Sequence, residues 1–167
     1  MYRTVSDFLA QWEYESSSTG RLLDVLTDAS LAQAVVPNGR TVGRLAWHIA
    51  QTLPEMMNKT GLAVAGVDEH ALPPSSAAEI AAAYRAASTS LVAEITAKWT
   101  DASLATDDEM YGERWTKAMT LGALVCHQIH HRGQLTVLMR QAGLTVPGVY
   151  GPAEEEWAHM GMEPPPV

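Results

Sequence analysis

The sequence is poor in cysteine, in basic residues and in long apolar runs, and each shortage excludes a class of protein. The single cysteine, Cys126, permits no intrachain disulfide and is compatible with a reducing compartment. There are 11 Lys and Arg against 19 Asp and Glu, giving a formal net charge of −8. Nucleic acid is therefore not an expected partner, because phosphate backbones are bound by clustered cations.

Long apolar stretches are also missing. No segment approaches the ~18 consecutive apolar residues that a membrane-spanning helix requires. The first residues, MYRTVSDFLAQWEYE, contain no apolar core typical of a secretory signal. We therefore expect no membrane partner and predict a cytoplasmic protein.

What the chain does have is the composition of a helical domain. Its 167 residues suit one domain with a single core. Aromatic residues are only 7% of the chain, and Ala and Leu are more frequent than Val and Ile, which favours helix. No strand pattern is persuasive, so the predicted fold class is all-α.

Apolar spacing and capping residues predict four helices, which should pack as a four-helix bundle over residues 1–145. Residues 146–167 should form a mostly irregular tail on the same domain, with one short helical turn around 153–158. Residues 100–119 are polar and are expected to form a loop. The four helices are predicted at about residues 4–27, 41–59, 75–99 and 120–143.

Three local signals qualify these boundaries. Residues 16–20 are weak helix formers in the middle of the first helix. Pro54 removes a backbone donor from the second helix, so a kink or break is expected near Thr52. Thr41, Ser75 or Ser76, and Thr120 are the expected N-caps, and Gly143 is expected just beyond the last helix.

Six histidines occur, and three of them crowd into the string CHQIHHRGQL of the fourth helix. His127 and His131 are four residues apart, so they lie on one helical face and can converge on one ion. A His127/His130 pair is a possible second choice. His48 lies in the middle of the second helix, where a bundle can place it opposite the pair.

Three histidine ligands with an open fourth position are typical of a catalytic metal site. The spacing H-x-x-x-H is only moderately specific, however, and Gln128 stands where a zinc protease would have Glu. A single histidine such as His48 is more often a hydrogen-bonded core residue. His70 and His159, in a loop and in the tail, are expected to be solvated.

The strings TVGRLAWHIAQT and TLGALVCHQIHHRGQLTVLMRQAG resemble the DinB-like family of metal-dependent proteins. The family pattern has one histidine on the second helix and H-x-x-H-H-R-G-Q-L on a later one. Here that later string begins at His127 and ends at Leu135, and helix order and spacing fit over about residues 4–145.

The resemblance implies a four-helix bundle in which His48, His127 and His131 bind one divalent metal ion, zinc or nickel. It also implies a homodimer. Relatives include transferases and isomerases that use low-molecular-weight thiols such as bacillithiol or mycothiol. A thiol cofactor and a small electrophilic substrate are therefore expected, with a metal-dependent transferase or hydrolase as the predicted enzyme.

Other residues near the motif are candidates for catalytic or supporting roles. Glu55 lies seven residues after His48 on the same helical face, where it is a candidate general base or an ordinary surface residue. Gln134 and His130 are candidates for supporting the histidine ligands from behind. Arg132 should point away from the histidine pair and form an ion pair, or else contact an anion.

Two alternatives to the enzyme remain open at this level. The protein could be a non-catalytic module that binds a metal or ligand, or a homodimer whose metal stabilises the fold. Cys126 is expected to be a small buried residue rather than a nucleophile. Gly133 suggests a place of close helix packing.

Overall fold

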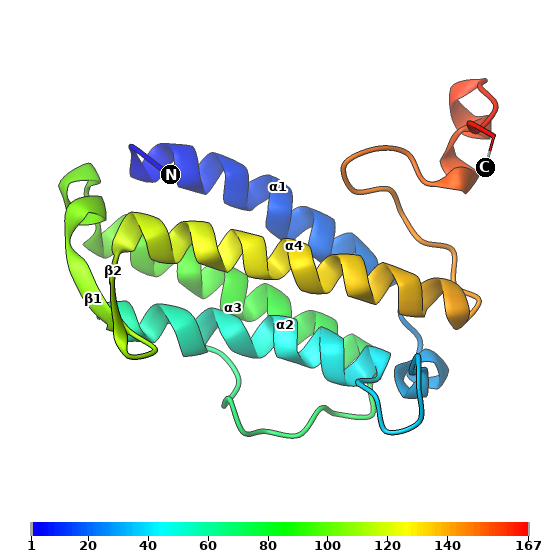
Figure 1. Ribbon diagram of the computed structural model, residues 1–167, viewed down its shortest axis with the longest axis horizontal. Helices are drawn as coiled ribbons and strands as arrows, with labels where there is room; N and C mark the ends of the chain where they lie inside the picture. Colours follow the sequence, from blue (N-terminus) through cyan, green and yellow to red (C-terminus); the bar gives the residue numbers. More distant parts are fainter. Residues whose placement is uncertain (1, 167) are drawn as a thin grey trace.

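The computed structural model describes residues 2–166, and its main body is a bundle of four long α-helices (Figure 1). Helices α1 and α2 each pack against both α3 and α4. The all-α prediction is confirmed. The helices are α1 (Val5–Asp24), α2 (Val42–Met57), α3 (Ala77–Lys98) and α4 (Lys117–Gln141).

Each helix begins at a side-chain cap that satisfies a free backbone N–H of the first turn. Thr41 accepts from the amide of Arg44 at 3.1 Å, and Ser76 accepts from the amide of Glu79 at 3.3 Å. Thr41 is the predicted cap of α2, and Ser76 is the one of the two predicted serines that caps α3. At the end of α4, Gly143 adopts φ 76°, as expected for a residue just beyond a helix.

The predicted cap of α4 at Thr120 is wrong. The helix begins one turn earlier, where Thr116 accepts from the amide of Met119 at 3.2 Å. Thr120 is instead fully buried inside the helix. Both threonines have suitable side chains, so sequence alone could not separate them.

Helix α1 runs without interruption through its weak helix formers. Ser18, Thr19 and Gly20 are buried where α1 packs in the bundle. The indole Nε1 of Trp12 donates to the Ser88 hydroxyl of α3 at 3.0 Å. Small side chains allow close approach of the two helices, and this packing outweighs their low helix propensity.

Helix α2 also continues past Pro54, so the predicted break near Thr52 is wrong. Pro54 lies in the last turn, so the lost backbone bond and any bend affect only the end of the helix. Its ring packs against the connection to α3, because a Cβ on Gly66 would lie 2.9 Å from Pro54 Cγ.

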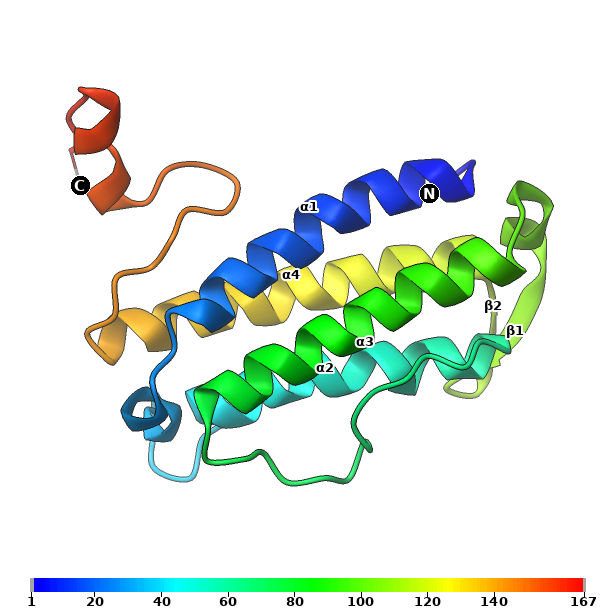
Figure 2. The ribbon, with the colours of Figure 1, turned by 180° about the vertical axis from the view of Figure 1, so that it is seen from behind.

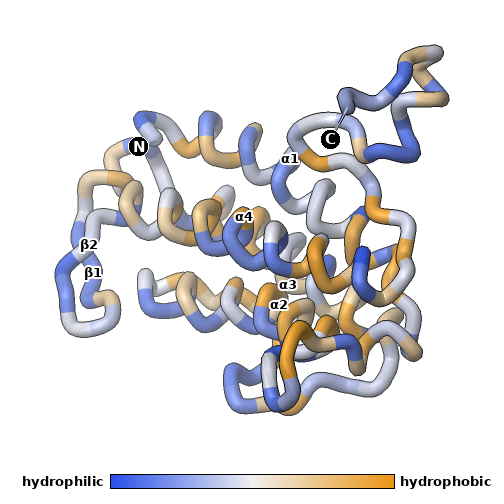
Figure 3. Tube along the Cα trace, turned by 45° about the vertical axis from the view of Figure 1, so that its right-hand side comes forward, coloured by the Kyte–Doolittle hydropathy of each residue, from blue (hydrophilic) through white to orange (hydrophobic). Residues whose placement is uncertain are grey.

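The prediction that residues 100–119 form a loop is wrong. They contain a 3₁₀ turn (Asp101–Ala105) followed by the antiparallel hairpin of β1 (Asp107–Met110) and β2 (Glu113–Thr116). Tyr111 and Gly112 form its tip, with φ values of 55° and 84°. The strands are short and mostly polar, so the usual apolar alternation is absent (Figure 3).

After α4 the chain continues as an irregular tail that extends away from the helices (Figure 2). It contains two short 3₁₀ turns, Glu154–Glu156 and Ala158–Met160, close to the predicted turn at 153–158. Val146 is buried against the core, and Arg21 of α1 donates to the Gly148 carbonyl at 3.3 Å. Residues 1 and 167, the ends of the two predicted segments, lie outside the described residues.

Apolar side chains from all four helices form one continuous core. Trp12, Tyr84, Leu91 and Ile49 are among its fully buried members. Within residues 2–166, no helix is long and apolar enough to cross a membrane.

Candidate metal centre

Three histidines from two helices meet on one side of the bundle. His48 comes from the middle of α2, and His127 and His131 come from α4. The Nε2 atom of His127 lies 3.2 Å from Nε2 of His48 and 3.1 Å from Nε2 of His131. One ligand atom from each residue can be chosen so that all three lie within 4.8 Å of one another.

The three histidines are brought together by the local geometry of α4 and by the packing of α2 against α4. Residues four apart on a helix are neighbours, which brings the rings of His127 and His131 to a centroid distance of 4.4 Å. The packing of α2 against α4 then brings in His48. His131 is buried, whereas His48 and His127 are partly exposed, so the cluster is open on one side.

Gln134 orients the ring of His131. The Gln134 carbonyl oxygen lies 2.8 Å from Nδ1 of His131, and its amide nitrogen lies 3.1 Å from Nε2 of His130. A carbonyl oxygen only accepts, so Nδ1 of His131 carries the proton and Nε2 presents a lone pair to the cluster. Gln134 therefore supports His131 from behind, and His130 stands outside the cluster as a further partner of Gln134.

The histidines of the cluster are held neutral. Burial lowers the pKa of His48 from 6.5 to about 4, helped by His131 and the positive charges of Arg40 and Arg44. Burial, followed by the neighbouring histidines, lowers the pKa of His127 from 6.5 to about 4. The pKa of His131 is also lowered, chiefly by burial. Neutral imidazole is the form that binds a metal ion.

The arrangement of nitrogen atoms fits a divalent cation better than it fits hydrogen bonds. A proton on Nε2 of His127 can be donated to Nε2 of His48 or to Nε2 of His131, but not to both. One of these two close nitrogen pairs is then left without a hydrogen bond between its atoms. Nδ1 of His127 is buried and has no hydrogen-bond partner among residues 2–166. Two nitrogens on a tetrahedral zinc ion, each at ~2.0–2.1 Å, lie ~3.3 Å apart, which is close to the observed separations.

Glu55 lies two turns after His48 on α2, as its spacing predicted, and it is held by two partners. The Tyr111 hydroxyl donates to its carboxylate at 2.7 Å, and the Lys59 ammonium lies 3.3 Å away. The negative charge of Glu55 acts on His127, raising its pKa slightly against the other influences. Tyr111, at the hairpin tip, is a residue that sequence reasoning missed, although the glycine that follows it, Gly112, is a turn signal.

Two arginines near the cluster were also missed. Arg40 and Arg44 both act on His48, and Arg44 is four residues before it on the same helical face. Arg44 donates to the Gln51 side chain at 2.9 Å. Its i, i+4 spacing from His48 was a signal that could have been used.

Arg132 points away from the histidines, as predicted, but its ion pair is deeply buried. Its guanidinium donates to Glu15 Oε2 at 2.5 Å and to the Glu15 backbone carbonyl at 2.9 Å. Tyr150 of the tail joins the pair, 2.7 Å from Arg132 and 2.8 Å from Glu15. The side chains of Arg132 and Glu15 are only 2% and 3% exposed.

Two expectations for α4 are wrong. Cys126 is exposed rather than buried, because its position places it on an outward face of the helix. Gly133 does not mark close packing, since a Cβ there would meet nothing within 4 Å.

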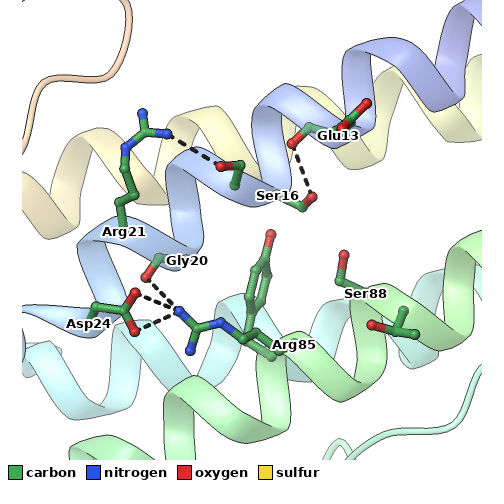
Figure 4. Close-up of a pocket in the computed structure, with 10 residues that line it drawn as sticks. Glu13, Ser16, Gly20, Arg21, Asp24, Arg85 and Ser88 are labelled. Atoms are coloured by element: carbon green, nitrogen blue, oxygen red, sulfur yellow. Dashed lines mark hydrogen bonds and ion pairs between the residues drawn. The ribbon is translucent and has the colours of Figure 1, made fainter.

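A hollow lies between α1 and α3, away from the histidines (Figure 4). It has a volume of about 400 Å³ and is lined mainly by hydroxyl and charged side chains. Arg85 crosses it to form an ion pair with Asp24 at 2.6 Å. None of the three clustered histidines lines this hollow, so it is separate from the candidate metal centre.

Comparison with known proteins agrees with this architecture. The sequence profile of the DinB family matches residues 1–165. The YrdA protein of Bacillus subtilis (strain 168) is 44% identical over 165 residues, which cover 99% of each chain.

Solved structures give the same result. A DinB-like protein from Bacillus cereus ATCC 10987 superposes with a TM-score of 0.88 at 47% identity, covering 90% of this chain and all of the other. The DinB-like protein YjoA of Bacillus subtilis superposes with a TM-score of 0.68 at 19% identity, covering 86% of this chain and 97% of the other, which supports the fold alone. The protein described here belongs to the DinB family.

Proposed function

We propose that this protein is a metal-dependent enzyme in which His48, His127 and His131 bind one divalent ion, zinc or nickel. The supporting observation is the convergence of three neutral imidazoles on a partly open space, with Nε2 separations of 3.1 and 3.2 Å. Three ligands leave a coordination position for a reactant, as in catalytic rather than structural sites.

The proposed reaction joins water or a low-molecular-weight thiol to a small electrophilic substrate, by transfer or by hydrolysis. When bound, the divalent ion supplies Lewis acidity, which favours the deprotonated form of a water or thiol at neutral pH. Nickel and zinc both suit imidazole ligands.

The chain's own residues supply orientation and proton handling. Gln134 holds the tautomer of His131 that presents Nε2 to the centre. Glu55 is proposed as the general base, because it is the carboxylate whose charge acts on His127. The Tyr111 hydroxyl fixes the carboxylate through its 2.7 Å hydrogen bond.

The first experiment is the metal content of the untagged protein by mass spectrometry. We expect near-stoichiometric zinc or nickel in the wild type and its loss in His127→Ala. His159→Ala is the matched control, because His159 is an exposed histidine of the tail and should leave the metal content unchanged. A wild type that takes up neither zinc nor nickel would refute the metal site.

The second experiment tests catalysis. Metal-loaded protein is incubated with bacillithiol or mycothiol and an electrophile such as 1-chloro-2,4-dinitrobenzene, and with p-nitrophenyl acetate for hydrolysis. We expect turnover in at least one assay, and a loss of turnover in Glu55→Gln with the metal retained. Metal-loaded protein that shows no thiol binding and no turnover would favour the alternative, a non-catalytic or structural metal site.

A homodimer is part of the proposal and rests on the family resemblance. Light scattering after size-exclusion chromatography measures the mass directly. A mass of twice the 18.0 kDa chain is expected, and the chain mass itself would contradict the dimer.

A further inference from the structure

An apolar groove of about 450 Å³ is lined in part by Gln134, which contacts His131 of the histidine cluster. The groove runs between the α1–α2 connection, the start of α2 and the last turns of α4. This volume is within the ~300–1,000 Å³ typical of small-molecule sites. Its apolar walls are formed by Val35, Val36, Leu45, Val137 and Leu138.

Several of these side chains are held in solvent by the backbone. Val35, Val36 and Val137 are 61%, 56% and 55% exposed. A tight turn keeps the first two in place, with the Gly39 amide donating to the Val36 carbonyl at 2.9 Å and Asn38 at φ 64°. Apolar side chains fixed in this way form a surface that gains free energy when a ligand covers it.

Two arginines carry positive charge in this region. Arg40 lines the groove, and Arg44 lies one helical turn before His48. Among residues 2–166, neither has a carboxylate oxygen within 4.0 Å. In a chain of net charge −8, two arginines without acidic partners create a local positive field.

We propose that this groove binds the apolar body of a small carboxylate substrate, whose anionic group is held by Arg40, a residue of the groove wall. The inference rests on the proposed function, because it names the substrate class of the same centre. Arginine suits the role, since its planar guanidinium binds carboxylates through two parallel hydrogen bonds. Arg40 makes no hydrogen bond to another described side chain, so it is free to turn toward a ligand.

The probe is 4-phenylbutyrate, with 4-phenylbutanamide as its neutral match. Each is titrated into metal-free protein, and the amide signals of residues 35–45 and 134–138 are followed by NMR. We expect the acid to bind at least about tenfold more tightly than the amide, as charge-assisted hydrogen bonds predict. Equal affinity for the two probes would overturn the proposal.

Three variants locate the binding. Arg40→Gln should weaken the acid about tenfold and leave the amide unchanged, because it removes a charge without breaking an internal hydrogen bond. Val137→Ser should weaken both probes. Arg3→Gln, an exposed arginine at the start of the chain, is the matched control and should change neither. Unchanged acid binding in Arg40→Gln would refute the anion site.

The groove could instead be covered by a second copy of the chain. In that case the groove amides would not respond to either probe, and Val137→Ser would convert a dimer into a monomer in light scattering. That pair of results overturns the proposal. Charge-selective binding of the acid without any uptake of zinc or nickel would leave the groove standing and refute the metal enzyme. Metal uptake without a preference for the acid would support the metal site and refute the proposed carboxylate groove.

Discussion

Two neighbouring residues of α4 belong to two different polar clusters, one of histidines alone and one that pairs a cation with an anion. His131 belongs to the histidine cluster with α2, and Arg132, about 100° further round the helix, pairs with Glu15 of α1. The Arg132 cluster contains both a cation and an anion, and its donors meet acceptors within the protein. The histidine cluster contains three similar groups that cannot satisfy one another.

The difference separates a structural cluster from a binding site. A buried ion pair with matched hydrogen bonds needs nothing from outside, and removing one partner leaves an uncompensated charge. In the proposed metal site, three converging lone pairs would gain most of their stabilisation from a cation that the chain itself does not supply. The first cluster should therefore govern folding, and the second should govern binding.

The largest effect is expected on breaking the ion pair. Arg132→Met leaves Glu15 buried without its partner and should lower the free energy of unfolding by about 3–5 kcal/mol, measured by urea denaturation. The double variant Arg132→Met/Glu15→Leu should recover much of this loss. Arg140→Met, which breaks the exposed pair with Glu155, is the matched control and should have little effect.

A double variant no more stable than Arg132→Met would contradict this account. The loss would then come from packing around the arginine stem rather than from an unpaired carboxylate.

The next largest effect concerns the metal. His127→Ala should lower zinc affinity by at least about 100-fold, measured by competition with a chromogenic chelator, because His127 lies between the other two ligands. The free energy of unfolding of the metal-free protein should change by only about 1 kcal/mol. A large loss of stability with little loss of zinc affinity would invert the comparison between the clusters.

A smaller effect is expected at the residue that orients His131. Gln134→Ala should reduce zinc affinity about 10–100-fold, since the His131 ring would lose the hydrogen bond that selects its tautomer. His130→Ala should reduce it less, because His130 contacts Gln134 and not the cluster. Equal losses in the two variants would indicate that His130 is itself a ligand.

The smallest effect is a pH dependence of the metal-free protein. The pKa values of His48 and His127 are about 4 in the folded state, below the ordinary 6.5, so the unfolded chain binds more protons between these values. Their contribution is therefore complete above about pH 6.5 and is lost as the pH falls toward 4. Urea midpoints from pH 7 to pH 4.5 should fall less steeply in His48→Asn/His127→Asn. An identical slope in both proteins would show that carboxylates alone cause the change.

The features that the sequence alone determined are those of short range. The cap at Thr41, a serine cap at position 75 or 76, the glycine after α4 and the shared face of His127 and His131 all follow from helix geometry over three or four residues. The motif around His127 also carried enough information to indicate the family. Such features depend on the backbone's local repeat and on little else.

Tertiary structure decided what joins distant residues. The pairing of Glu15 with Arg132 spans 117 positions, and the hairpin places Tyr111 on Glu55 across 56. The sequence shows a net charge of −8 but not that two arginines stand beside the histidines without acidic partners. These arrangements arise because the burial of apolar surface selects how the helices pack, and packing then places polar groups that no local spacing relates.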